Sequence, residues 1–371
     1  MQHNPSFDGR GSNVHVGGSA ITRRALVGSL LSLGLTAGEA HADAADFYKG
    51  KTLNIVVGYG PGGGYDLFAR LLARYIGNYI PGKPAVTVQN MPGAASLRAT
   101  NYLATIAPKD GTVIATFDRN IPLIAFVSGS PNVQYDPLKF VWLGTLSDST
   151  DDAFVIWARQ KGNISSIEDL RRPGGPSLTV GVTGVGATDN DIAVLLKTVL
   201  GLRLNIVPGY QDSNAIGLAV ENGELDGQLI GFVAGRIAKP AWMDPKSDMK
   251  VLLQFARKTR HPDLPEAPTA RELATDERAT QLITMAELPY VVGRPFAAPP
   301  GVPADRAEAL QDAFARLIRD QEFLREAKRL NIDLTPLDAK DTFAAVEALG
   351  RSPIALRNEL RDILYAPVKN P

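Results

Sequence analysis

Residues 54–66 read Asn54-Ile-Val-Val-Gly-Tyr-Gly-Pro-Gly-Gly-Gly-Tyr-Asp66. An apolar run at 53–57 ends at the glycines, and apolar residues with helical spacing follow at 67–80. This pattern predicts a strand, a tight loop and a helix. A loop of this kind directs several backbone N–H groups and the positive end of a helix dipole toward one point. The stretch therefore predicts a binding site for an anion.

The composition of the 371-residue chain narrows the possible functions. Hydrophobic residues make up 44% of the chain and charged residues 21%, which is typical of a soluble globular protein with room for two domains. Lysine plus arginine equals aspartate plus glutamate, at 39 each, so a nucleic-acid partner is not expected. The chain has no cysteine, and only one of its four histidines, His261, lies beyond residue 42. Disulfides, thiol catalysis, a histidine-based triad and a multi-histidine metal site are therefore not expected.

The first 42 residues have the pattern of an export signal. Arg23 and Arg24 precede an apolar stretch at 25–37, and Ala40-His41-Ala42 follows. A basic start, a short apolar middle and an A-x-A end are the parts of a secretory signal. The paired arginines leave both the general secretory route and the twin-arginine route open. We therefore expect a periplasmic protein cleaved near Ala42, with no later membrane-spanning segment.

The rest of the chain alternates predicted strands and helices, which indicates parallel sheets covered by helices. The first unit has strands at 53–57, 85–88 and 112–117 and helices at 67–80 and 95–107. The second unit has strands at 153–158, 178–182, 204–207 and 226–230, a short helix that begins after Ser165 and Ser166, and helices at 190–200 and 213–222. A segment at 251–255 is expected to lead back to the first domain. Helices are also predicted in the tail, at 305–320, 322–330, 340–349 and 353–364. The pattern predicts an α/β fold with two domains.

Two other interpretations of the first glycine-rich loop have to be considered. Residues 58–63 match G-x-G-x-x-G between a strand and a helix, as in a dinucleotide site. That site also requires an acidic residue about 20 positions further on, and no Asp or Glu lies between Asp66 and Asp110. The loop could also be a tight turn without a ligand. Three successive glycines, Gly62 to Gly64, are more than such a turn needs.

A second glycine-rich turn, at 183–189, follows a strand of the second unit. Thr183 and Thr188 offer hydroxyl donors there, although the turn could serve only to begin the next helix. Asp189 and Asp191 suit the first turn of that helix. Because they would repel a ligand carboxylate, we expect at least one of them to face solvent or a ligand ammonium group.

Two further side chains are candidates for the same cleft. Arg119 follows a strand near the first loop and could pair with a carboxylate, or it could be a solvated surface arginine. Tyr210 could line a cleft or pack at the end of a strand. The chain has no G-x-S-x-G, H-E-x-x-H or P-loop motif, so catalysis has no positive support.

Several motifs resemble the substrate-binding receptors of tripartite tricarboxylate transporters, the Bug-type periplasmic proteins. They lie, in order, at 47–66, 88–95, 107–112, 207–210, 222–226 and 297–303. The resemblance implies a two-domain, type II-like Venus-flytrap fold. In that family, backbone amides of the first glycine-rich loop and its helix hold most of a ligand carboxylate, and the second glycine-rich loop supplies further contacts. Two departures from the family pattern matter. Met91 and Ala95 replace an arginine and a glycine, and Gln211 replaces a common lysine, so the carboxylate cannot be named by analogy.

The sequence thus predicts a solute receptor with a signal at 1–42, one domain at 43–147 plus 256–371 and a second at 148–255. It would bind a small carboxylate between the domains and deliver it to membrane permease subunits, as a monomer without catalytic residues, metal or cofactor. The alternatives are an exported cofactor-binding enzyme and a sensor that acts on a signalling partner. The predicted ligand-binding residues are Tyr59, Pro61, Gly62, Gly63, Gly64, Tyr65, Asp66, Arg119, Thr183, Gly184, Gly186, Ala187, Thr188 and Tyr210.

Overall fold

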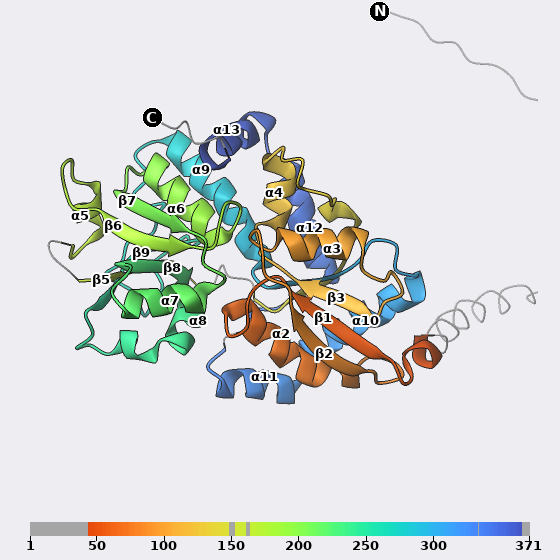
Figure 1. The fold of residues 1–371 in the computed structure, drawn as a ribbon. Helices are drawn as coiled ribbons and strands as arrows, with labels where there is room; N and C mark the ends of the chain where they lie inside the picture. Colours follow the sequence, from red (N-terminus) through yellow and green to blue (C-terminus); the bar gives the residue numbers. More distant parts are fainter. Residues whose placement is uncertain (1–43, 148–152, 161–163, 333, 366–371) are drawn as a thin grey trace, which may run out of the picture. The chain divides into compact units, whose positions relative to one another are not determined.

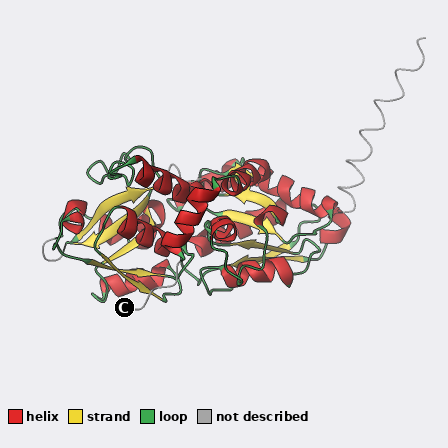
Figure 2. Ribbon diagram, turned by 90° about the horizontal axis from the view of Figure 1, so that it is seen from above, coloured by secondary structure: helices red, strands yellow, loops and turns green. Residues whose placement is uncertain are grey.

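The computed structural model describes residues 44–147, 153–160, 164–332 and 334–365 (Figure 1). The predicted export signal lies outside these residues. Within them the strands form two sheets, each flanked by helices on both sides (Figure 2). None of the helices in this part of the chain combines the length and the hydropathy that crossing a membrane requires.

The first sheet is mixed and contains the three predicted parallel strands at one side. Its order is β11-β4-β10-β3-β1-β2. β1 pairs in parallel with β2 and β3, whereas β10 and β11 pair antiparallel with their neighbours. The strands are β1 (Thr52–Val57), β2 (Ala85–Asn90), β3 (Val113–Thr116), β4 (Val141–Thr145), β10 (Pro295–Ala298) and β11 (Leu337–Asp338).

The second sheet has the order β7-β6-β8-β5-β9. β6 pairs in parallel with β7 and β8, and β5 pairs antiparallel with β8 and β9. The segment that was expected to lead back to the first domain is therefore itself an edge strand of this sheet. The strands are β5 (Phe154–Arg159), β6 (Leu178–Val182), β7 (Leu204–Pro208), β8 (Gly227–Gly231) and β9 (Met249–Phe255).

Most of the predicted helices are present, and three that were not predicted, α4, α8 and α9, join them. α2 buries Phe68, Leu71 and Leu72 on one face, as the helical spacing of its apolar residues requires. The helices are α2 (Gly64–Tyr75), α3 (Leu97–Thr105), α4 (Ile121–Val127), α5 (Ile167–Arg171), α6 (Thr188–Val199), α7 (Ser213–Glu221), α8 (Phe232–Ala238), α9 (Glu277–Glu287), α10 (Ala304–Leu317), α11 (Gln321–Arg329), α12 (Ala339–Gly350) and α13 (Ile354–Leu364). The short 3₁₀ segments are η1 (Ile76–Asn78), η2 (Pro137–Lys139), η3 (Pro240–Met243) and η4 (Leu288–Val292).

Each sheet has apolar cores on its faces, and two late helices pack with the second sheet. Ile283 of α9 and Leu360 of α13 are fully buried in the same cluster as Val180 of β6 and Leu196 of α6. α9, α13 and α6 lie together in Figure 1. The tail thus contributes to the core of the second sheet as well as to the first. The domain boundaries inferred from the sequence remain a prediction.

Candidate functional site

A cavity of about 60 Å³ lies where loops from the two sheets meet. This exceeds the roughly 10–15 Å³ that one water molecule needs, so the cavity has room for a small ligand. Its walls come from the start of α2, the segment after β3, the start of β5, the turn between β6 and α6, the start of α7, and the junction of β8 with α8. The lining residues are Tyr59, Gly63, Gly64, Tyr65, Asp118, Arg119, Phe154, Thr183, Thr188, Asp189, Asp212, Ser213, Leu229, Ile230, Gly231, Ala234 and Arg294.

The N-terminus of α2 forms one wall of the cavity. Gly63 is its N-cap residue, and glycine has no side chain that could cap the helix. Gly63 and Gly64 both line the cavity. The first amide groups of a helix have no partner within the helix and carry partial positive charge. This wall therefore favours an anion.

Asp66 holds the loop in place and does not line the cavity. Its carboxylate accepts hydrogen bonds from the amide of Gly62 at 2.9 Å, from Nε of Arg70 at 2.8 Å and from Nδ2 of Asn90 at 2.9 Å. These bonds lower the pKa of Asp66 against the opposing effect of burial. Gly62 has a φ of +87°, which favours glycine. The Asp66 side chain thus stabilises the conformation of the loop without lining the cavity.

Aromatic rings and two guanidinium groups stand beside the α2 terminus. The rings of Tyr59 and Tyr65 are stacked, with their centroids 4.9 Å apart. The guanidinium carbon of Arg294 lies 4.7 Å from the centroid of Tyr65, and that of Arg119 lies 4.5 Å from the centroid of Tyr290. Both arginines are buried. A buried cation next to a helix N-terminus strengthens the preference for an anion, because the local dielectric constant is low.

The N-terminus of α6 already has a carboxylate, which comes from Asp118. Oδ1 of Asp118 accepts a hydrogen bond from the hydroxyl of Thr188 at 2.6 Å, and Oδ2 accepts one from the amide of Thr188 at 3.4 Å. The hydroxyl of Tyr59 also donates to Asp118, and the amide of Asn120 donates at 2.8 Å. Asp118 is 1% exposed. A side chain that follows β3 of the first sheet therefore caps a helix of the second.

Two more carboxylates are buried in the first turn of α6. Asp189 lines the cavity and accepts hydrogen bonds from the amide and the hydroxyl of Thr183, each at 2.9 Å. Asp191 accepts hydrogen bonds from the hydroxyl of Tyr365 at 2.7 Å and from the amide of Gly186 at 3.0 Å. Burial raises the pKa of each aspartate to about 7. The sequence led us to expect that at least one of them faces solvent or a ligand ammonium group. Neither side chain is exposed to solvent.

The N-terminus of α7 is capped by Asp212, whose Oδ1 accepts hydrogen bonds from the amides of Asn214 and Ala215 at 2.9 Å. Asp212 lines the cavity and also packs against the first loop. A Cβ atom at Gly60 would collide with Oδ2 of Asp212. Glycine at this position thus permits close contact between the loop before α2 and the start of α7.

The structure brings together half of the residues predicted for the site. Asp118 precedes Arg119 and Asp212 lies two residues after Tyr210, but neither carboxylate was predicted to belong to the site. Arg294 and the residues around β8 had no local signal. The predicted residues that line the cavity are Tyr59, Gly63, Gly64, Tyr65, Arg119, Thr183 and Thr188. The predicted residues that do not line it are Pro61, Gly62, Asp66, Gly184, Gly186, Ala187 and Tyr210.

Tyr210 lines a neighbouring hollow of about 390 Å³, together with Tyr59, Thr183 and Gln211. Pro92, Ala95 and the residues between them form the opposite side. Two of the positions that depart from the family pattern, Ala95 and Gln211, thus lie in this hollow.

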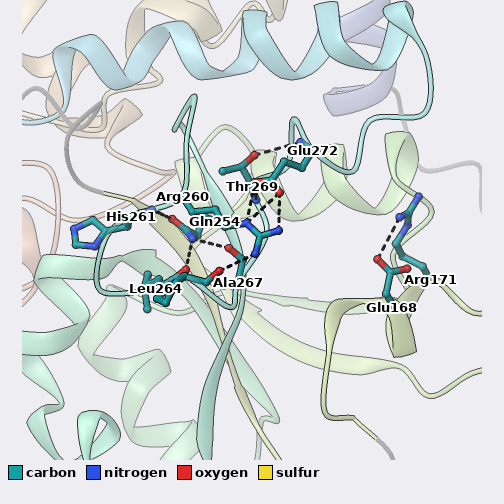
Figure 3. A network of polar contacts seen from close by, with 10 residues as sticks. Glu168, Arg171, Gln254, Arg260, His261, Leu264, Ala267, Thr269 and Glu272 are labelled. Carbon is teal, nitrogen blue, oxygen red and sulfur yellow. Dashed lines mark hydrogen bonds and ion pairs between the residues drawn. The ribbon is translucent and has the colours of Figure 1, made fainter.

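His261 belongs to a structural network that follows β9 (Figure 3). Oε1 of Gln254 accepts a hydrogen bond from the amide of His261 at 2.8 Å, and its Nε2 donates to the carbonyl of Leu264 at 2.8 Å. Arg260 forms an ion pair with Glu272, with Nη2 2.7 Å from Oε2. This network fixes the loop and shares no residue with the cavity lining. In the described part of the chain, no group of three or more His, Asp or Glu side chains is placed to hold a metal ion.

The sequence and the fold were compared with those of known proteins. No family model matches the chain. Protein BugT of Bordetella pertussis is 29% identical over 249 residues, which cover 65% of this chain and 72% of that protein. The solved periplasmic binding protein BugD has a TM-score of 0.66 at 20% identity, and the match covers 85% of this chain and 98% of BugD. The R. palustris protein Rpa4515, solved with adipate, has a TM-score of 0.64 at 19% identity, with 85% and 97% covered.

These comparisons confirm the predicted resemblance to Bug-type substrate-binding receptors. The fold is the two-sheet α/β fold of periplasmic binding proteins, as predicted. Proteins of this class are solute receptors and not enzymes, which agrees with the prediction for this chain.

Proposed function

We propose that the protein is a periplasmic receptor that binds a small carboxylate in the cavity at the N-terminus of α2. It would deliver this ligand to the membrane permease subunits of a tripartite tricarboxylate transporter. The domains would comprise residues 43–147 with 256–371, and residues 148–255. The protein would act as a monomer after cleavage near Ala42.

One observation carries the proposal. Of the three helix N-termini at the cavity, those of α6 and α7 have aspartate carboxylates of the chain within hydrogen-bond distance of a first-turn amide, whereas the N-cap residue of α2 is Gly63, which has no side chain to cap the helix. Nη2 of Arg294 would lie 3.3 Å from a Cβ atom at Gly64, so a buried cation adjoins the α2 terminus. Amides at a helix terminus and a guanidinium group are the donors that carboxylates prefer.

The ligand class is supported by the neighbour that was solved with adipate. In the proposed mechanism, closure of the domains around the ligand removes water. The amides and guanidinium groups then interact with the carboxylate more strongly than in water. The closed form would be the one that the permease recognises.

Isothermal titration calorimetry with a panel of mono-, di- and tricarboxylates tests the proposal. We expect saturable binding with unchanged ligand on recovery. Binding of a nicotinamide or flavin cofactor without any carboxylate would favour the alternative of an exported cofactor-binding enzyme. Genes for permease subunits beside the gene for this chain would favour transport over sensing.

A further inference from the structure

We propose that the receptor binds an α-amino acid, whose ammonium group is held by the carboxylate of Asp212 beside the N-terminus of α2. The inference rests on the proposed function, since it concerns the same cavity and the same position of the ligand carboxylate. It narrows the ligand from carboxylates in general to those that carry an amino group on the neighbouring carbon.

Asp212 differs from the other two carboxylates that line the cavity, because one of its oxygens lacks a donor. Asp118 accepts hydrogen bonds on both oxygens, and so does Asp189. Oδ1 of Asp212 accepts the amides of Asn214 and Ala215, but no described residue gives Oδ2 a hydrogen bond or an ion pair. Asp212 is 6% exposed. Because a buried carboxylate oxygen without a donor is unfavourable, Oδ2 indicates that the ligand supplies one.

The Asp212 carboxylate lies against the loop that precedes α2. A Cβ atom at Gly60 would collide with Oδ2, and a Cβ atom at Gly63 would lie 3.5 Å from Cβ of Asp212. Gly63 and Gly64 line the same cavity as Asp212. A ligand carboxylate at the first amides of α2 would therefore lie next to Asp212, and the donor for Oδ2 has to come from a ligand atom close to that carboxylate.

The charge of Asp212 favours an ammonium group as this donor. Two carboxylates side by side in a medium of low dielectric constant repel each other. A ligand hydroxyl would give Oδ2 a hydrogen bond but would leave this repulsion uncompensated. An ammonium group donates up to three hydrogen bonds and attracts both carboxylates. An α-amino acid carries its ammonium group on the carbon next to its carboxylate, which is the arrangement that this part of the cavity requires.

Apolar side chains form the wall that the rest of the ligand would meet. Phe154, Leu229, Ile230 and Ala234 line the cavity and come from β5, β8 and α8. An apolar wall favours hydrocarbon over a hydrated group. Amino acids with short aliphatic side chains are therefore the first ligands to test.

The test compares acids that share a carbon skeleton and differ only at the carbon next to the carboxylate. Calorimetric titration of the full mature protein would use alanine, lactate and propionate, then norvaline, 2-hydroxypentanoate and pentanoate, and then aspartate, malate and succinate. In each set that binds, we expect the amino acid to bind at least about tenfold more tightly than the acid without the amino group, with the hydroxy acid between them. An amino acid that binds no more tightly than its hydroxy or unsubstituted partner would overturn the inference and leave the proposed function intact. Failure of every carboxylate to bind would overturn both.

A variant tests the part assigned to Asp212. Asp212→Asn keeps an oxygen that can cap α7 and removes the negative charge, so the preference for the amino acid over the unsubstituted acid should fall about tenfold or more. Asp276→Asn is the matched control, because Asp276 is the exposed N-cap residue of α9 and accepts the amide of Ala279 at 2.7 Å. It should leave the preference unchanged. An unchanged preference in folded Asp212→Asn would contradict the assignment. If that variant does not fold, the comparison of ligands with the wild-type protein decides.

Discussion

The hydroxyl of Thr188 donates a hydrogen bond of 2.6 Å to the carboxylate of Asp118. Asp118 follows β3 of the first sheet, and Thr188 is the first residue of α6, which follows β6 of the second sheet. The bond therefore joins the two sheets at the wall of the cavity. A motion that separated these elements would have to break it.

Removing the hydroxyl of Thr188 should destabilise the fold. Thr188→Val keeps the shape of the side chain but deletes a donor to a buried carboxylate, which should cost about 1.5–3 kcal/mol. Chemical denaturation measures this change. Thr280→Val is the control, because its hydroxyl donates to a backbone carbonyl at the exposed start of α9, and it should cost about 1 kcal/mol or less. Equal effects of the two substitutions would contradict the special role of the bond.

Substitution of Gly63 should block the site without unfolding the protein. Gly63 has a φ of −78°, which any residue adopts, and a Cβ atom there would lie 3.5 Å from Asp212 and Ser213. Gly63→Ala should therefore fold and weaken binding, and Gly63→Val should abolish measurable binding because its methyl groups fill the cavity. Calorimetry gives the affinity, and a melting curve confirms folding. Retained affinity in Gly63→Val would remove this loop from the site.

Arg294 should contribute strongly to carboxylate affinity. Arg294→Gln removes a buried positive charge beside Gly64, and we expect the affinity to fall about 10- to 100-fold. Arg294→Lys should recover part of the loss, since it restores the charge without the planar fork. Arg316→Gln is the control and should leave the affinity unchanged, because 59% of the Arg316 side chain on α10 is exposed. If Arg294→Gln, Arg294→Lys and Arg316→Gln all kept the wild-type affinity, the ligand would have to bind away from Arg294.

The buried aspartates of α6 should make stability depend on pH. Burial raises the pKa of Asp191 from an ordinary value of 3.8 to about 7. Between these values the native state binds more protons than the unfolded state, so this group lowers stability as pH rises from about 4 to about 7. Asp191→Asn removes this dependence. Its melting temperature relative to wild type should therefore be higher at pH 8 than at pH 5.

Two controls complete the pH experiment. Asp189→Asn should act in the same direction, because burial also raises the pKa of Asp189 to about 7. Asp312 lies on α10 with 48% of its side chain exposed, so Asp312→Asn should show no such change in relative melting temperature between the two pH values. A difference between Asp191→Asn and wild type that is the same at both pH values would contradict the raised pKa.

The late helix α13 should contribute to the core of the second sheet. Leu360 is fully buried in that cluster, whereas Ile354 on the same helix is 68% exposed. Leu360→Ala should lower the free energy of unfolding by about 2–5 kcal/mol, and Ile354→Ala by no more than about 0.5 kcal/mol. If denaturant titrations showed similar small losses in the free energy of unfolding for Leu360→Ala and Ile354→Ala, α13 would not pack as described.

The sequence was most informative where local signals were strong. The strand at 53–57, the glycines and the helix that follows could be predicted, because spacing and turn chemistry act within a few residues. β10 was not predicted, because it is only four residues long and is defined by antiparallel pairing with β3 and β4. Pairing between distant segments has no local signature.

The predictions for the site also succeeded where the signal was local and failed where it depended on distant residues. The helix N-terminus at Gly63 could be predicted from the glycines that precede α2. Arg294 could not be predicted, because it reaches the cavity from a distant part of the chain. The role of Asp118 could not be assigned either, since it depends on contact with Thr188 of the other sheet. The alternation of strands and helices predicted two α/β domains, the resemblance to Bug-type receptors agreed with that prediction, and the structure showed which charged side chains surround the proposed ligand position.

A crystal structure of the protein with a bound carboxylate tests the proposed site most directly. We predict the ligand carboxylate within about 2.7–3.2 Å of backbone amides at the N-terminus of α2, next to Arg294, with Asp118 still bonded to Thr188. A ligand in the hollow beside Tyr210, or one whose carboxylate displaces Asp118 from α6, would contradict the proposal.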